Sequence, residues 1–333
     1  MNLPDPRGPL SAVVRGLLTG ADAGSADLPD PLLPDSADPL VDEDLHLALW
    51  MLYELHYRGF ADVPDVLEWD PELLSLRAAL EAPFEETLRR LAAPYVTDAL
   101  AGSEDLVEQV QAVVEAVEVA PLAAYLQRHA TREQVLHFLA ERSVYHLKES
   151  DPHSFVLPRI DGRAKVALAE LQYDEYGAGR PDRLHARLYA DALAAAGLRT
   201  GYAAYVDQVG AETLAVNNVM SLFGLHRRLR GAALGHLAAF ESTSSMPCRR
   251  IAAGAERVGL PPAVAAYFDE HVEADAVHEQ VAVRDICGSL VAAEPELRED
   301  VLLGVAACLL LDARAAERML ADWAHDDETE RAS

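Results

Sequence analysis

The sequence predicts an all-α protein, and three observations support this prediction. Apolar residues recur at helical spacing along most of the chain, and residues 42–60 (DEDLHLALWMLYELHYRGF) are typical, with Gly59 as a stop signal. The alternation of apolar and polar residues that indicates strands is nearly absent. No internal repeat with a period of roughly 20–50 residues is present.

The first 41 residues are expected to form an acidic, proline-rich arm that is extended or mobile. Residues 22–44 contain eight acidic residues, four prolines and no Lys or Arg, a composition that cannot bury enough apolar surface to fold alone. Ordered structure is therefore expected to begin near Asp42. Helices of residues 42–130 are predicted to pack on the core as an added layer, because their apolar surface is too broad to stay exposed.

The core helical bundle is expected at residues 131–325, followed by a solvated acidic tail at residues 326–333. Helices are predicted where start and stop signals bracket the helical periodicity, as at the N-cap residues Ser103 and Thr131 and the stop at Pro152. The last two predicted helices are also compatible with one kinked helix. The predicted ranges are residues 72–92, 103–118, 131–150, 162–176, 181–196, 212–241, 246–258, 261–282, 295–311 and 312–325.

Composition excludes several classes of protein. The chain has 333 residues, of which half are hydrophobic, so it can build a sizeable core. The net charge of −27, from 55 acidic and 28 basic residues, argues against nucleic acid as a partner. Three widely spaced cysteines suggest neither a disulfide scaffold nor a thiolate zinc site. No signal peptide is evident and the most apolar stretch, residues 301–311, is too short to span a bilayer. We therefore expect a cytoplasmic protein without a membrane partner.

The strongest chemical signal is the segment HVEADAVHEQ. His271, Asp275 and His278 stand at positions i, i+4 and i+7, which places them within a sector of about 60° on one helix. A His–carboxylate–His face of this kind can direct three ligands at one metal ion. The alternative is a polar helix face that contains two histidines by chance.

A second set of candidate ligands lies earlier in the chain, at Glu149, Glu175 and His185. A helical bundle can bring these residues to the histidines of the first set. Three neutral imidazoles and three carboxylates would balance much of the charge of two ferrous ions and leave coordination positions open. The absence of soft ligands from the set argues against copper(I) or an iron–sulfur cluster.

The H-x3-D-x2-H run resembles the last core helix of the haem-oxygenase-like di-iron oxidases and oxygenases. The gaps of 26, 10 and 86 residues that separate Glu149, Glu175, His185 and His271 are also similar to those in that family. The phrases YHLKESDPH, LQYDEYGAGRP and SLFGLHRRLRGAALGHLAAFE look like bacterial iron-containing redox enzymes. Within the family, the N-oxygenating central domain of the N-nitrosourea-forming enzyme is similar. The resemblance covers roughly residues 131–323.

The resemblance implies a haem-oxygenase-like helical bundle with additional N-terminal helices. It also implies a non-haem centre of two Fe(II) ions that uses dioxygen as co-substrate, held by Glu149, Glu175, His185, His271, Asp275 and His278. Glu175 would be the ligand shared by both irons. Reactions in the family include N-oxygenation, desaturation and oxidative C–C cleavage. The expected substrate is thus a small molecule that carries an amine or a carboxylate, and an external electron donor is compatible with this chemistry.

Four further residues are candidates for supporting roles. His153 could donate a hydrogen bond to a ligand carboxylate, although a histidine in a cap or loop is the simpler interpretation. Glu241, on the long predicted helix, could reach the pocket. Arg227 and Arg249 could hold a substrate carboxylate, or could form internal salt bridges with the many acidic residues.

Two other functions remain compatible with the residues. One is a haem-oxygenase-like enzyme without di-iron redox chemistry, such as a thiaminase-type hydrolase or a cofactorless oxidase. The other is a protein that binds a metal or ligand without turnover. A complete six-residue ligand set favours the di-iron oxidase or oxygenase, because those alternatives do not need it. The N-terminal helices could form a lid over the site or a contact in a homodimer.

Overall fold

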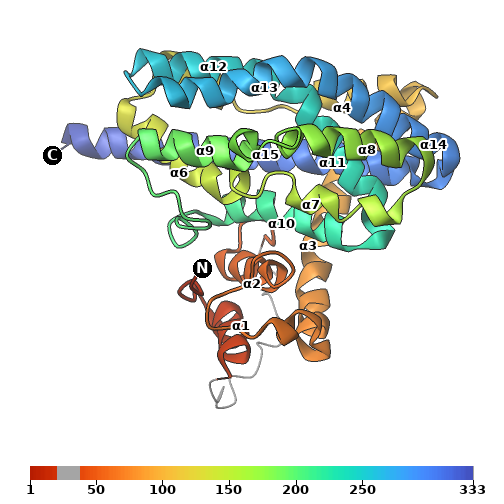
Figure 1. Cartoon of the computed structure of the whole chain (residues 1–333), viewed down its shortest axis with the longest axis horizontal. Helices are drawn as coiled ribbons and strands as arrows, with labels where there is room; N and C mark the ends of the chain where they lie inside the picture. The colour runs from red at the N-terminus through yellow and green to blue at the C-terminus, as the bar shows by residue number, and fades with distance from the viewer. Residues whose placement is uncertain (21–37, 333) are drawn as a thin grey trace.

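The protein is a bundle of helices with a smaller group of N-terminal helices attached to one side (Figure 1). The computed structural model describes residues 1–20 and 38–332, without the side chains of 273–277 and 326–332. No strand occurs in these described residues, which confirms the all-α prediction. The α-helices are α1 (Pro9–Thr19), α2 (Glu43–Glu54), α3 (Pro71–Gly102), α4 (Leu106–Ala116), α5 (Leu122–Arg128), α6 (Arg132–His146), α7 (Asp151–Ser154), α8 (Gly162–Glu175), α9 (His185–Ala195), α10 (Ala211–Leu225), α11 (Arg230–Thr243), α12 (Ser245–Arg257), α13 (Pro262–Gln280), α14 (Ser289–Ala293) and α15 (Arg298–Ala332).

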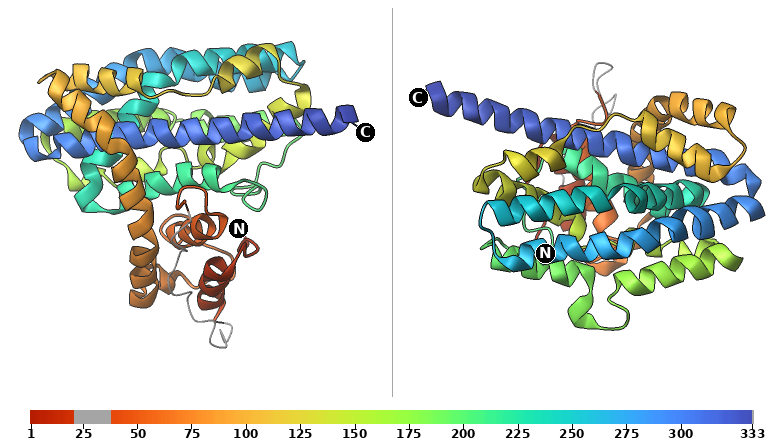
Figure 2. Two further views of the ribbon diagram at one scale, coloured as in Figure 1. Left: turned by 180° about the vertical axis from the view of Figure 1, so that it is seen from behind. Right: turned by 90° about the horizontal axis from the view of Figure 1, so that it is seen from above.

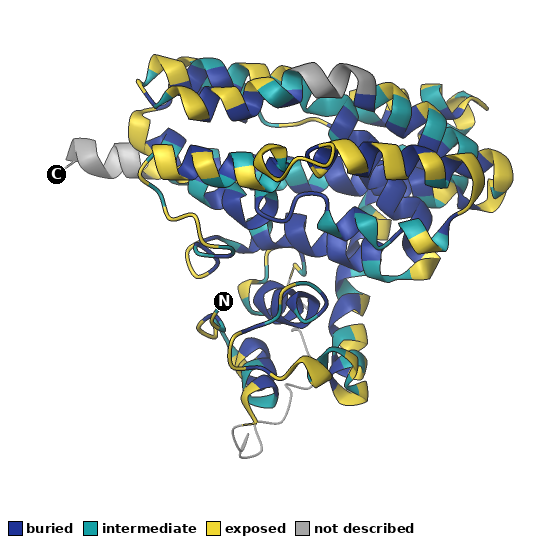
Figure 3. Cartoon of the chain, viewed as in Figure 1, coloured by how far each residue is buried: buried dark blue, intermediate teal, exposed yellow. Residues whose placement is uncertain are grey.

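The centre of the bundle is the pair formed by α11 and α15, whose backbones approach very closely. A Cβ atom added to Gly235 would lie 1.9 Å from the carbonyl oxygen of Val301, and one added to Gly304 would lie 2.0 Å from that of Ala232. Only glycine permits such an approach. Around this pair the interior is buried, and the outer faces of the surrounding helices are exposed (Figure 3).

The N-terminal helices share a continuous hydrophobic core with the bundle. Helix α2 packs against α10, and α3 runs from the N-terminal group to α15 (Figure 2). Buried residues of α2, among them Trp50 and Tyr53, belong to the same cluster as Leu234 of α11 and Leu302 of α15. The N-terminal group is therefore packed onto the bundle by apolar burial.

The expectation of an extended arm over residues 1–41 is wrong for α1. Its buried residues Leu10, Val14 and Leu18 recur every fourth position and so form one apolar stripe. Asp44 of α2 accepts hydrogen bonds from the backbone N–H groups of Leu10 and Ser11, both at 2.7 Å. These hydrogen bonds stabilise the start of α1. The helix therefore depends on a contact with α2, which follows the acidic segment in the sequence. The remainder of the predicted arm, residues 21–37, lies outside the described residues.

The single helix predicted over residues 212–241 is in fact two helices, α10 and α11, with a short 3₁₀ turn between them. His226 has an extended backbone conformation (ψ 114°) that ends α10. Just before it, the backbone of Gly224 packs against α7, where an added Cβ would lie 2.5 Å from the carbonyl oxygen of Pro152. Two other limits also differ, because α3 continues past residue 92 to Gly102 and the backbone of α15 continues through the predicted tail to Ala332.

None of the described helices is both long enough and apolar enough to cross a membrane.

Burial of His46 predicts that stability falls on mild acidification. The ring is fully buried on α2 beside Asn218, whose amide lies 3.2 Å from Nδ1. Burial lowers the pKa of His46 from 6.5 to about 4. Between pH 6.5 and pH 4, the unfolded chain therefore binds a proton at His46 that the folded chain does not bind. The stability that is present above pH 6.5 is lost as the pH falls toward 4.

We expect wild-type protein to lose about 2 kcal/mol more unfolding free energy than His46→Gln between pH 7 and pH 5. Urea unfolding of both proteins at the two pH values measures this difference. Because each protein's unfolding free energy at pH 5 is subtracted from its own value at pH 7, any pH-independent effect of the substitution on stability cancels. Parallel pH profiles for the two proteins would contradict the assignment of a neutral buried imidazole.

Candidate metal centre

Glu149 is placed by a turn between α6 and α7. The N-cap predicted at Thr131 is present, and it forms a capping box: the Thr131 hydroxyl accepts from the N–H of Gln134, and the Gln134 side chain accepts from the N–H of Thr131. Helix α6 ends at His146, four residues earlier than predicted, and the next helix begins at Asp151 with Pro152 in its first turn. The intervening turn directs the buried carboxylate of Glu149 into the bundle.

Glu175 and His185 meet across a tight loop. Glu175 is the last residue of α8 and His185 is the first residue of α9. Gly177, in the loop between them, has a φ of +79°, and a Cβ there would lie 2.4 Å from the carbonyl oxygen of Arg180. The loop brings Nδ1 of His185 to 2.8 Å from Oε2 of Glu175.

Helix α13 carries His271, Asp275 and His278, as the spacing predicted. Nδ1 of His271 donates a hydrogen bond to the carbonyl oxygen of Tyr267 at 2.9 Å, which leaves Nε2 to face the interior. An imidazole oriented by a backbone carbonyl in this way is typical of metal-binding histidines. The side chain of Asp275 lies outside the described residues. After Gln280 the helix continues as a π-helix, η5 (Val281–Gly288), a form that often occurs at functional sites.

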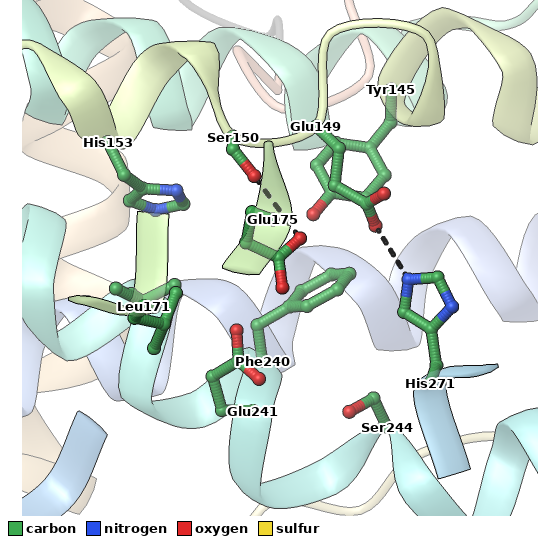
Figure 4. A pocket seen from close by; sticks show the side chains of 11 residues that line it. Tyr145, Glu149, Ser150, His153, Leu171, Glu175, Phe240, Glu241, Ser244 and His271 are labelled. Carbon is green, nitrogen blue, oxygen red and sulfur yellow. Dashed lines mark hydrogen bonds and ion pairs between the residues drawn. The ribbon is translucent and has the colours of Figure 1, made fainter. Parts of the chain in front are cut away.

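The buried side chains form two adjacent three-residue clusters, each with its ligand atoms within 4.8 Å of one another. One cluster consists of Glu149, His185 and His271, and the other consists of Glu175, Glu241 and His278. The close pair His185–Glu175 joins the two. Figure 4 shows the carboxylate of Glu149 directed toward His271, and those of Glu175 and Glu241 directed toward each other.

Two histidine nitrogens indicate that these clusters suit a cation. Nδ1 of His185 and Nε2 of His271 are buried and have no hydrogen-bond partner among the described residues. Carboxylate oxygens nevertheless lie 2.8 Å from the first, at Glu175, and 3.6 Å from the second, at Glu149. These nitrogen and oxygen atoms converge without forming hydrogen bonds. A metal ion bound between them would satisfy their lone pairs.

The electrostatics of the first cluster also favour a cation. Burial would lower the pKa of His271, but the negative charge of Glu149, together with that of Glu175, raises it to about 10. Burial would raise the pKa of Glu149, but His146 and His271 hold it well below its ordinary value. The carboxylates therefore create a negative potential strong enough to keep His271 protonated at neutral pH when no metal neutralises it.

Other side chains orient the carboxylates. The hydroxyl of Tyr267 donates to Oε2 of Glu149 at 3.1 Å, and Nδ1 of His146 lies 3.1 Å from Oε1. The hydroxyl of Ser150 donates to Oε2 of Glu175 at 3.3 Å. A small cavity between the two clusters is lined by residues of both, among them Glu149 and Glu241. His153 is buried at its edge, and Nε2 of this histidine has no hydrogen-bond partner in the described part of the chain.

The structure thus brings together five of the six predicted ligands, while the side chain of Asp275 lies outside the described residues. Glu241, predicted in a supporting role, instead completes the second cluster. The signal that could have found it is its position as the only acidic residue of α11, a mostly apolar helix.

The two arginines predicted to hold a substrate lie elsewhere. Arg227 is exposed in the 3₁₀ turn that separates α10 from α11, and Arg249 is exposed on α12. Neither lines the cavities that touch the two clusters. The break in the predicted long helix carries Arg227 to the surface.

Two buried carboxylate–histidine clusters inside a helical bundle are typical of metal-binding helical proteins. The family model of iron-containing redox enzymes matches residues 136–313, and the chain belongs to that family. The match covers more than half of the chain and includes both clusters. It confirms the haem-oxygenase-like bundle, with α1 to α5 as additional N-terminal helices. Comparison with curated proteins found no match.

Proposed function

We propose that the protein is a non-haem di-iron oxidase or oxygenase that activates dioxygen and acts on a small substrate bearing an amine or a carboxylate. The observation that carries this proposal is the presence of two adjacent buried clusters, each with three hard or borderline ligands. Carboxylates and imidazoles suit ferrous iron, and the family match supports iron over other metals. Two Fe(II) ions, when bound, supply the electrons that reduce dioxygen.

The residues of the chain then have distinct roles. Glu149, His185 and His271 would hold one ion, and Glu175, Glu241 and His278 the other. Tyr267 and Ser150 keep the carboxylates of Glu149 and Glu175 in fixed orientations. Burial of all six ligands excludes bulk water, which protects a reactive oxidant from side reactions. An external electron donor would return the irons to the ferrous state after each turnover that consumes their electrons.

The test is anaerobic loading of the protein with Fe(II), followed by exposure to dioxygen. We expect about two irons per chain, rapid oxygen consumption and a transient absorption band in the visible range. Amino acids and fatty acids are then screened for substrate-triggered oxygen consumption. Protein loaded with redox-inert Zn(II) is the matched control and should consume none.

A protein that retains no iron after desalting would contradict the proposal. So would oxygen consumption no faster than that of the same concentration of free Fe(II). Metal binding with no oxygen consumption, across the whole screen, would instead favour a metal-binding protein without redox turnover.

A further inference from the structure

A second cavity adjoins the metal centre and has a different chemical character. Its volume is about 100 Å³. Four residues are shared with the small cavity between the two clusters, namely Glu149, Phe240, Ser244 and His271. A molecule in the larger cavity would therefore lie directly beside the first cluster.

The walls of this cavity are largely apolar. They come from α6, α11, α12, α13 and α15, so the cavity lies inside the bundle. Aromatic and aliphatic walls bind an apolar body by excluding water from it. The main apolar wall residues are Phe138, Phe240, Ile251, Phe268 and Leu309.

One charged pair lies in the wall away from the metal centre. Nη2 of Arg142, on α6, donates to Oδ1 of Asp312, on α15, at 2.5 Å. No other hydrogen bond of Arg142 is found within the described residues. A guanidinium carries five N–H donors and a carboxylate can accept several bonds, so both groups retain capacity for a ligand. Their side chains are 20% and 37% exposed, so the pair is accessible.

The face of α6 sets the length of the cavity. Arg142 and His146 line it one turn apart on α6, and Glu149 lines it from the turn that follows the helix. At 1.5 Å per residue, Arg142 and His146 are separated by about 6 Å along the helix axis. A medium-sized molecule can therefore contact Arg142 at one end and approach Glu149 and His271 at the other.

We propose that this cavity binds α-amino acids with medium-sized apolar side chains, with the carboxylate at Arg142 and the ammonium at Asp312. The identification of such a molecule as a substrate rests on the proposed function, whereas its binding does not. In a zwitterion, the carboxylate lies against the positive charge of Arg142 and the ammonium against the negative charge of Asp312. Its binding leaves the net charge of the site unchanged. A simple carboxylate places an uncompensated negative charge beside Asp312, and a simple amine places a positive charge beside Arg142. The side chain then points toward the metal centre, which favours reaction at the side chain over the α-carbon.

The test compares three probes with matched chains, L-norleucine, hexanoate and pentylammonium, by calorimetry on Zn(II)-loaded protein. We expect L-norleucine to bind at least tenfold more tightly than either of the others. Arg142→Gln should remove the advantage of L-norleucine over pentylammonium, because both then rely on Asp312. Asp312→Asn should remove its advantage over hexanoate, because both then rely on Arg142.

The control is the pair Arg163–Asp285, which joins α8 to η5 at 2.6 Å on the outside of the bundle. Arg163→Gln and Asp285→Asn should leave all three affinities unchanged. Equal affinities for the three probes in the wild-type protein, or no binding of L-norleucine at millimolar concentration, would overturn the inference. This wild-type comparison decides the matter even where a variant fails to fold.

The two proposals fail separately. Binding of L-norleucine by a protein that takes up no iron would leave the cavity assignment standing and remove the di-iron function. Oxygen consumption by the iron-loaded protein without selective binding of L-norleucine would support the di-iron function and remove the cavity assignment.

Discussion

His271→Ala and His278→Ala are each expected to lower the iron content from about two ions per chain to about one. His271 belongs to one cluster and His278 to the other, so each substitution removes one of the three proposed ligands of a single ion. Loss of a supporting residue around a metal already costs about 10–100-fold in affinity, and loss of a ligand should cost at least that. Iron is measured by colorimetric assay after anaerobic loading and desalting.

His137→Ala is the matched control for this experiment. His137 lies on α6 with a half-exposed side chain and belongs to neither cluster. It should keep about two irons, which shows that loss of a histidine as such is not the cause. Two irons in both His271→Ala and His278→Ala would contradict the assignment of the clusters. Loss of both ions in each variant would show that the two positions fill as one unit.

Glu54→Gln is expected to destabilise the protein by about 3 kcal/mol or more, because it leaves a buried ammonium without its opposite charge. Glu54 of α2 forms an ion pair with Lys148, and both side chains are almost completely buried. The hydroxyl of Tyr202 also donates to Glu54, at 2.8 Å, and glutamine keeps an acceptor for it. Urea unfolding of the metal-free protein measures the loss of stability.

The double variant Glu54→Gln/Lys148→Met should recover most of this loss, since uncharged residues of similar volume often replace a buried ion pair at little cost. Glu43→Gln on the same helix is the control. Glu43 pairs with Arg7 but is half-exposed, so its loss should cost at most about 1 kcal/mol. Wild-type stability of Glu54→Gln would show that the pair contributes nothing to the fold.

The Glu54–Lys148 ion pair connects the N-terminal helices to the candidate metal centre. Lys148 immediately precedes the proposed ligand Glu149, and the guanidinium of Arg58 donates to the carbonyl oxygen of Leu147 at 3.3 Å. Arg58 and Lys148 also line a cavity of about 110 Å³ that touches Glu149, Glu175 and His185. The family match begins only at residue 136, yet α2 supports the turn that carries the proposed ligand Glu149. Glu54→Gln should accordingly also lower iron retention.

Local patterns in the sequence accounted for the features that depend on one helix at a time. The helical class followed from periodicity, and the face shared by His271 and His278 followed from the fixed geometry of α13. Thr131 marked the start of α6, since an N-cap acts within a few residues, whereas the helix ends at His146, before the stop expected at Pro152. The stripe of α1 was overlooked because the acidic segment that follows it dominated the composition of the first 41 residues.

The sequence by itself determined the helical fold class, the family resemblance and five of the residues in the two clusters. Only the tertiary structure decided that Glu241 completes the second cluster, that Arg142 and Asp312 face one cavity, and that Glu54 supports Lys148. The physical reason is the range of the interactions. Spacing along one helix is set by its 3.6-residue turn, whereas a contact between helices depends on how closely and at what angle they pack. That packing is set by the whole core, including the glycine contacts of α11 with α15.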